Sequence, residues 1–344
     1  MPCPRMAVTN TATNETSSPG CPVDWFRGNL PWLLVLAISL SIITSYFHHH
    51  LYVSAPNLEL LSIDHLKVVQ GYAEAPMQYR PAPYFMAQTL LNVTVRFGLP
   101  NNSYTLVLCY FILQFVATTL CYLALLKFLS MWFDLGRSIL GLCFLVAVNP
   151  LAEFQYYHQP GDPWNFLFFL LGYIAIARRR DAWLWPIIFI GVPFRETVLL
   201  LIPAYFAARI GEAPVRKIIL WTLALCAAWL IPTVALRLIF GFHQNYMVGK
   251  LIRSGLPSVL YFNLTRPEGW LVLFLYFNVL WLALPLTWRR LPKTIRRMFV
   301  IVPIFLIVHL FWGRLIEGRL YMPLMPLFLP AGLAYLGNAF PERR

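Results

Sequence analysis

The stretch from Tyr104 to Phe128, YTLVLCYFILQFVATTLCYLALLKF, carries one charged residue, Lys127, in 25 residues. A helix needs about 20 consecutive apolar residues to cross the hydrocarbon core of a bilayer. This stretch is therefore long enough to span a membrane, and it predicts a membrane-embedded protein.

The composition of the whole chain agrees with this prediction. Of its 344 residues, 59% are hydrophobic and 12% are charged, whereas soluble domains have about 45–50% apolar and about 25% charged residues. Its 14 acidic and 27 basic residues are too few to cover a water-soluble surface of this size. Most soluble classes and intrinsically disordered chains are thereby excluded. Because no basic block lies in a soluble domain, the formal net charge of +13 does not indicate a nucleic-acid partner.

Apolar stretches divide the chain into predicted membrane spans. Residues 1–29 form a polar tail, and residues 30–344 form a single helical domain. A further stretch, 182–208, is broken at Pro193-Phe194-Arg195-Glu196, and each half is too short to cross the bilayer, so it predicts a hairpin of two half-helices. The predicted fold class is an all-α polytopic membrane protein. Its eight full spans are 30–50, 104–128, 138–151, 163–177, 217–240, 270–287, 298–312 and 321–338.

The distribution of Lys and Arg predicts the orientation. With a cytoplasmic N-terminus, 17 of the 27 basic residues fall in inside segments. The densest groups, Arg178–Arg180 and the Trp288–Arg297 loop, then occupy short cytoplasmic loops, where basic residues are most enriched. Both termini are therefore expected in the cytoplasm. The predicted outer loops are 52–103, 152–162, 241–269 and 313–320, and together with the tip of the hairpin at Arg195-Glu196 they hold eight of the 14 acidic residues.

The first outer loop is predicted to carry two interfacial helices, at about 58–72 and 83–99. In the second of these, Gln88, Asn92 and Arg96 recur every fourth residue and form one polar stripe on an apolar helix. Such a stripe is typical of a helix that lies in the membrane interface.

Two outer aspartates are candidate site residues, and the first of them, Asp64, is a candidate general base. Asp64 follows the first span, where apolar surroundings raise the pKa of a carboxyl group towards neutrality; the alternative is a solvated residue on a polar helix face. Asp162 lies in His158-Gln159-Pro160-Gly161-Asp162-Pro163. His158 and Asp162 are candidates for a metal or acceptor site, and the alternative for Asp162 is to cap a helix that begins at Pro163.

Charged residues in two other outer segments are candidates for substrate binding. Arg80 suits a bidentate contact with a phosphate, or it extends to lipid headgroups. Arg195 and Glu196 are adjacent opposite charges between two half-helices, and such charges are costly at membrane depth unless they face protein or water. They are predicted either to form a structural ion pair or to line a polar cavity.

A third charged group lies in Arg314-Leu315-Ile316-Glu317-Gly318-Arg319-Leu320-Tyr321. Two guanidinium groups that flank one carboxylate suit an anion such as a lipid phosphate, with Glu317 orienting them. The alternative is that Arg314 and Arg319 anchor the chain to lipid headgroups.

Three motifs resemble elements of the GT-C class of polytopic glycosyltransferases. The late element Glu317-Gly318-Arg319-Leu320-Tyr321-Met322-Pro323 is similar to the Glu-x-Arg-x-Tyr-x-x-Pro element of that class. The Pro193-Phe194-Arg195-Glu196-Thr197 hairpin and Tyr79-Arg80-Pro81 resemble elements in bacterial membrane proteins related to it. The arrangement of a first span, a long outer loop with an early acidic residue and many uneven spans is also similar.

This resemblance implies transfer of a sugar from a polyprenyl-phosphate donor to an acceptor hydroxyl on a glycan, lipid or protein, with inversion, at the outer face of a bacterial inner (plasma) membrane. The matching base is Asp64, with Asp162 as the alternative. No cofactor is required by the resemblance, although some members of the class use a divalent metal. A lipid-linked glycan transporter or flippase component and a polyprenyl-linked glycan polymerase are the competing interpretations. The expected substrate-binding residues are Arg80, His158, Arg195, Glu196, Arg314, Glu317, Arg319 and Tyr321.

Overall fold

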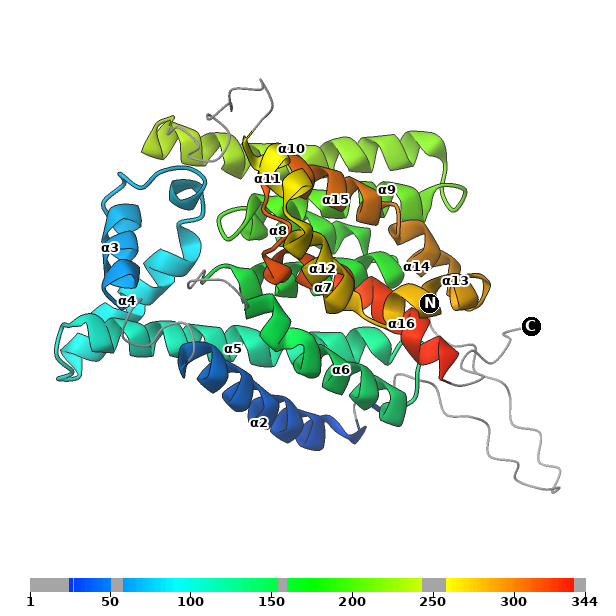
Figure 1. The fold of residues 1–344 in the computed structure, drawn as a ribbon. Coiled ribbons are helices and arrows are strands. Elements are labelled where there is room, and N and C mark those ends of the chain that lie inside the picture. The colour runs from blue at the N-terminus through cyan, green and yellow to red at the C-terminus, as the bar shows by residue number, and fades with distance from the viewer. Residues whose placement is uncertain (1–24, 27, 51–57, 154–159, 243–257, 337–344) are drawn as a thin grey trace, which may run out of the picture.

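The computed structural model describes residues 25, 26, 28–50, 58–153, 160–242 and 258–336, and the regular elements within these ranges are helices (Figure 1). The α-helices are α2 Leu30–His48, α3 Leu58–Val69, α4 Ala82–Arg96, α5 Ser103–Leu129, α6 Leu135–Glu153, α7 Asp162–Ala177, α8 Leu184–Gly191, α9 Leu201–Arg209, α10 Val215–Phe240, α11 Ser258–Thr265, α12 Pro267–Phe277, α13 Leu280–Thr287, α14 Lys293–Met298, α15 Ile301–Trp312 and α16 Met325–Tyr335. Short 3-10 helices join several of them, namely η3 Met77–Tyr79, η4 Asp181–Trp183, η5 Glu196–Leu200, η6 Trp288–Arg290 and η7 Gly318–Leu324.

Five helical segments in the described ranges are long and apolar enough to cross a membrane. They are Leu30–His48, Ser103–Leu129, Leu135–Ala152, Val215–Phe240 and Lys293–Trp312. A sixth span is formed if α12 and α13, which are bent by 60° at a short break, are counted together. The multi-pass membrane character expected from the composition is therefore supported by these helices.

The prediction of eight full spans is not confirmed. The stretch 163–177 corresponds to α7, which has only 16 residues, and the stretch 321–338 is divided between η7 and the 11-residue α16. Most side chains of α16 are buried against other helices. An apolar run produces the same hydropathy signal whether protein or lipid surrounds it, so burial inside the bundle explains the excess in the predicted number.

The described residues form two hydrophobic cores. The larger core fills the bundle of α5–α10 and α12–α16, together with α2. The smaller core joins α3, α4 and the first part of α5 through Leu61, Val68, Tyr84, Leu91 and Tyr110. We call this second unit the α3–α4 module; it stands at one end of the bundle in Figure 1. The predicted helices at 58–72 and 83–99 are present as α3 and α4, whereas their position in a membrane interface stays a prediction.

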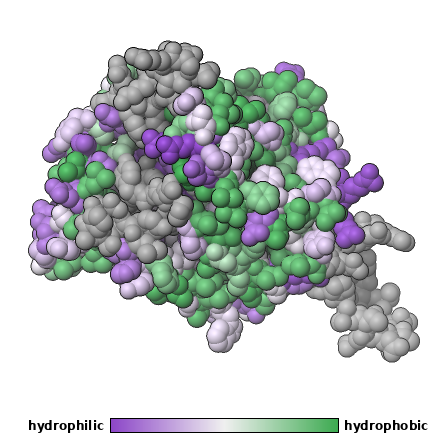
Figure 2. Space-filling view, viewed as in Figure 1, coloured by the Kyte–Doolittle hydropathy of each residue, from purple (hydrophilic) through white to green (hydrophobic). Residues whose placement is uncertain are grey.

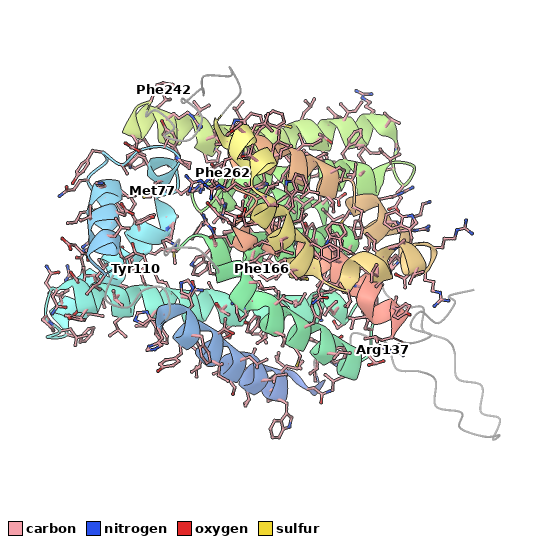
Figure 3. The ribbon with its side chains drawn as sticks, in the orientation of Figure 1. Met77, Tyr110, Arg137, Phe166, Phe242 and Phe262 are labelled. Atoms are coloured by element: carbon pink, nitrogen blue, oxygen red, sulfur yellow. The ribbon has the colours of Figure 1, made fainter. Side chains whose placement is uncertain are left out.

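The ends of the bundle differ in charge. Three loops with predicted cytoplasmic Arg residues meet at one end, where Arg209 donates to Asp181 (Nε–Oδ1, 3.1 Å) and Glu212 pairs with both Arg179 and Arg297. The contact between Arg209 and Asp181 also shows that 181–209 returns to the end where it began, as predicted for the hairpin. Figure 3 shows Arg137 near this end and Met77 and Phe242 towards the other. In Figure 2, apolar surface covers much of the middle, and hydrophilic residues gather mostly at the margins.

Candidate functional site

Asp162, the first residue of α7, lies between two arginines from distant parts of the chain. Its Oδ1 accepts a hydrogen bond from Arg195, at the break between α8 and η5. Its Oδ2 accepts from Nη1 of Arg319 at 2.5 Å, and Nη2 of Arg319 donates to Glu317 at 2.5 Å. All four side chains are nearly inaccessible to solvent. The hairpin and the late motif are thereby joined through one carboxylate.

A second ion pair extends this cluster to the α3–α4 module. Arg80, after η3, binds Glu196 bidentately, with Nε–Oε2 at 2.8 Å and Nη2–Oε1 at 2.7 Å. The next hydrogen bond along the chain, from Ala82 N to Pro193 O, joins the same two segments. Arg195 and Glu196 thus form ion pairs with different partners rather than with each other.

We refer to these six residues as the Asp162 network. It contains three arginines and three carboxylates, so its formal charges sum to zero. Burying ionic groups is costly unless each is paired and hydrogen-bonded, and the pairing here meets that condition. The members of the Asp162 network are Arg80, Asp162, Arg195, Glu196, Glu317 and Arg319.

Two glycines allow the backbone segments of the network to approach closely. A Cβ atom at Gly318 would lie 2.2 Å from the carbonyl oxygen of Leu151 on α6. A Cβ atom at Gly161 would lie 2.8 Å from the carbonyl oxygen of Phe194 in the hairpin break. Real Cβ atoms do not approach backbone this closely, so glycine at both positions lets α7, η7 and the hairpin converge on Asp162.

The predicted capping role of Asp162 is wrong. Gly161 occupies the N-cap of α7, Asp162 lies within the first turn, and no side chain caps the helix. The carboxylate is instead taken by Arg195 and Arg319.

Two small cavities lie beside Asp162, each with about 20 Å³ of space. Arg80, Arg195 and Tyr84 line one of them, between the α3–α4 module and the hairpin break. Arg319 lines the other, together with polar side chains of α2, α5 and α6. Each cavity has room for about one water molecule. Asp162 is thus the residue that the two cavities share.

Asp64 does not lie in the Asp162 network. It is half-buried on α3, has no hydrogen bond or ion pair among the described residues, and lines neither cavity beside Asp162. Partial burial raises the pKa of the Asp64 carboxyl group, and the nearby Lys67 partly opposes this effect. The neighbouring His65 is buried and bonds both Tyr110 and Gln88 at 2.8 Å. The first candidate base therefore has a favourable pKa but lies outside the charged cluster.

The other predicted site residues have separate positions. Tyr321 is fully buried below the network, and its hydroxyl donates to Leu315 O at 2.5 Å, which supports the turn that carries Arg319. Arg314 is exposed and stacks over the ring of Phe262 at 5.4 Å. His158 lies outside the described residues.

Two residues near the network were not predicted from the sequence. The indole Nε1 of Trp229 on α10 donates to Glu196 O at 3.0 Å and so fixes the hairpin break. Arg237, near the end of α10, stacks over Tyr79 at 4.5 Å. The sequence does distinguish Arg237. It is a basic residue close to the predicted outer end of an apolar span, where few basic residues occur.

Among the described residues, no group of three or more His, Cys, Asp or Glu side chains is arranged to hold a metal ion. Comparisons with protein families, curated proteins and solved structures find no match to this chain. The geometry of the site and the motifs that meet there are therefore the evidence for its function.

Proposed function

We propose that this protein transfers a sugar from a polyprenyl-phosphate donor to an acceptor hydroxyl. The observation that carries the proposal is the binding of one carboxylate, Asp162, by two arginines from distant motifs, with a third arginine in the same network. Arg80, Arg195 and Arg319 come from the three separate motifs that resemble the GT-C class; Arg195 and Arg319 bind Asp162, and Arg80 binds Glu196.

In this proposal, Arg195 and Arg319 hold the phosphate of the donor. Guanidinium groups bind phosphate through paired, charge-assisted hydrogen bonds. The acceptor oxygen attacks the anomeric carbon, the bond from that carbon to the phosphate oxygen breaks, and the phosphate leaves with the electron pair. The arginines stabilise the negative charge that develops on this leaving group. In-line attack inverts the configuration of the sugar.

Asp162 is proposed as the base that takes the proton of the acceptor. A base must first lie within hydrogen-bond reach of the reacting atoms, and only then does its pKa matter. Asp162 meets the first condition, because it borders both cavities and touches both arginines. Two guanidinium groups hold this carboxylate; a phosphate that takes over their N–H groups releases it to accept the proton. Asp64 has a raised pKa, which suits a base, but it lies outside the Asp162 network. It is the alternative base.

A donor sugar needs more room than the present cavities give. The Arg80–Glu196 pair and the Ala82–Pro193 hydrogen bond join the α3–α4 module to the hairpin break beside the cavity that Arg80 lines. We propose that the donor binds after these contacts open.

The location of charged side chains supports an enzyme over the competing transporter. The cavity beside Arg319 includes polar side chains near the middle of α5, Gln114 and Thr118. The paired charges, in contrast, lie at the two ends of the bundle, in the Asp162 network and in the Arg-rich loops. A transporter needs polar groups along its spans for alternating access. We place the end that holds Asp162 outside the cell, because the Arg-rich loops meet at the opposite end.

Purified protein supplied with polyprenyl-phosphate sugars tests the proposal. We expect consumption of one donor by the wild type, loss of that activity in Asp162→Asn, and retained activity in Asp64→Asn. Loss in Asp64→Asn together with full activity in Asp162→Asn would assign the base to Asp64. Absence of turnover with every donor, combined with movement of a lipid-linked glycan across vesicle membranes, would favour the transporter.

A further inference from the structure

A third cavity, larger than the two beside Asp162, is lined by Glu196 but not by Asp162. It has a volume of about 180 Å³ and is bounded by η3, the hairpin break and the end of α10. The side chains used in this inference are Tyr79, Glu196, Thr233, Arg237 and Phe242, all of which line it.

The cavity has an unbalanced positive charge. Both oxygens of Glu196 already accept hydrogen bonds from Arg80. Arg237 has no carboxylate partner in the described part of the chain, where its hydrogen bond goes from Nη1 to Thr233 O at 3.0 Å. A guanidinium group has five N–H donors, so most of the donors of Arg237 remain for a ligand. The charge and the donors together favour an anion.

The ring of Tyr79 fixes the position of the Arg237 guanidinium group. The guanidinium group lies over this ring, with its Cζ atom 4.5 Å from the ring centre. The hydroxyl of Tyr79 donates to Gly241 O at 2.8 Å, which fixes that ring against the end of α10. A stacked guanidinium group presents its N–H edge in one plane, and this arrangement matches the oxygens of a phosphate.

The size of the cavity limits what enters it. Sites for whole small-molecule ligands have volumes of about 300–1,000 Å³, so a volume of about 180 Å³ suits a headgroup rather than an entire lipid-linked sugar. The part of α10 that borders the cavity also has an exposed apolar face, on which Leu230, Val234 and Leu238 follow one another at intervals of four residues and are 43–74% exposed. A ligand with a phosphate head and a hydrocarbon chain fits both features.

We propose that this cavity is a second phosphate site, separate from the Asp162 network, that binds the headgroup of a membrane amphiphile. Arg237 supplies the charge, Tyr79 orients Arg237, and the hydrocarbon chain lies along Leu230, Val234 and Leu238. The site does not depend on the proposed sugar transfer, since the amphiphile bound here need not be the donor.

Binding measurements on the full chain in detergent test this site without turnover. Native mass spectrometry with decyl phosphate, decanol and inorganic phosphate as ligands gives three affinities for each variant. We expect wild-type protein to prefer decyl phosphate. Arg237→Gln should weaken that binding about 10-fold or more, because it removes charge-assisted hydrogen bonds, and Arg237→Lys should lose less.

The matched control is Arg266→Gln. Arg266 is another guanidinium group that stacks on an aromatic ring, that of Phe262 at 4.9 Å, but it is exposed and lies at the start of α12. Its replacement should leave binding unchanged. Equal affinities of Arg237→Gln and wild type for decyl phosphate would overturn the site, and so would equal binding of decanol. Inorganic phosphate bound as tightly as decyl phosphate would overturn the amphiphile. Decyl phosphate binding through Arg237 in a protein that turns over no sugar donor would support this site and contradict the proposed function.

Discussion

Both ends of α7 carry guanidinium–carboxylate networks, but the two networks contact different parts of the chain. At the C-terminal end, Asp181 and Glu212 pair with Arg179, Arg209 and Arg297, a group that we call the Asp181 network. At the N-terminal end lies the Asp162 network. Both are built from the same residue types, and each contains an arginine whose side chain is nearly inaccessible to solvent, Arg209 in one and Arg319 in the other.

In the Asp181 network, arginines donate hydrogen bonds to carbonyl groups near the C-termini of two helices. Arg209 donates to Ile176 O at 2.8 Å, near the C-terminus of α7, and Arg297 donates to Ala208 O at 3.0 Å, near the C-terminus of α9. The last carbonyl groups of a helix lack partners within the helix and favour nearby cations. These arginines thus have a structural reason for their positions, and Arg179 at the edge of the network is largely exposed.

The Asp162 network has no such local purpose. Its arginines bind side-chain carboxylates at a break in the backbone, and its central residue borders two cavities. Charge and burial alone therefore do not distinguish the Asp162 network from the Asp181 network. What separates the two networks is the partner of each guanidinium group: main-chain carbonyls and carboxylates at one end, carboxylates beside a cavity at the other.

The largest expected effect is a difference in sugar-transfer activity between variants of the two networks. Asp162→Asn should reduce sugar transfer by about 10²-fold or more, as expected for loss of a general base, whereas Asp181→Asn should retain near wild-type turnover. Both variants should lower the melting temperature, because each removes a carboxylate that pairs with a buried arginine: Arg195 loses its pair with Asp162, and Arg209 keeps only the longer contact with Glu212. Turnover and thermal unfolding, measured on the same preparations, check this. Equal activities in the two variants would remove the functional distinction between the networks.

A second prediction concerns the glycine that lets η7 approach α6. Gly318→Ala should destabilise the protein by about 1–3 kcal/mol, the range for overpacking a close contact, since the new Cβ would lie 2.2 Å from Leu151 O. Gly136→Ala, where the nearest atom is Asp134 Oδ1 at 3.5 Å, is the control and should be neutral or slightly stabilising in its helix. Thermal unfolding of both variants gives the comparison, and an unchanged Gly318→Ala would show that the two backbones are not in tight contact.

A third prediction tests the junction of the α3–α4 module. Arg80→Gln removes the bidentate pair with Glu196, so amide hydrogen exchange in 58–98 should accelerate about 10-fold, as expected for loss of a charged hydrogen bond. Arg137→Gln breaks a more exposed pair with Asp134 at 3.6 Å and should leave exchange in 58–98 unchanged. Similar exchange in the wild type and Arg80→Gln would mean that other contacts hold the module.

The smallest expected effect concerns Asp64 and pH. Partial burial raises the pKa of Asp64 in the folded protein, so the folded state favours the protonated form, and the ionised form costs stability at neutral pH. Asp64→Asn should therefore stabilise the protein slightly at pH 7, within about 0.5 kcal/mol. This gain should shrink as the pH falls and wild-type Asp64 takes up its proton. Melting temperatures of both proteins across acid and neutral pH measure it; a gain that grows towards acid would contradict the raised pKa.

Much of the helical architecture could be predicted from the sequence because apolar length is a local property. The stretches 30–50, 104–128 and 217–240 match α2, α5 and α10 closely. The number of spans was not predictable, since the side chains of α16 are buried by protein rather than by lipid. The break at Pro193 was visible for a similar reason: proline and adjacent charges interrupt an apolar run.

The candidate site could be predicted only as separate pieces. Arg80 and Glu196 are 116 positions apart, and Asp162 and Arg319 are 157 apart. Which charge pairs with which depends on helix packing, and no spacing rule reports it. For the same reason Asp162 was predicted as a possible cap, although its carboxylate faces two arginines. Arg237 lay in an apolar span and was not selected, because its stacking on Tyr79 joins elements that are far apart in the chain.

The two hydrophobic cores share one helix. The first part of α5 contributes Leu106, Cys109 and Tyr110 to the α3–α4 module, and its second part contributes Cys121 and Leu125 to the bundle. Successive residues of an α-helix are rotated by about 100° around its axis. A single residue inserted midway along α5 would therefore swing the module around the bundle by that angle and carry Arg80 away from Glu196. The length of α5, counted in residues, sets the rotational register between the part of the site on the module and the part on the bundle.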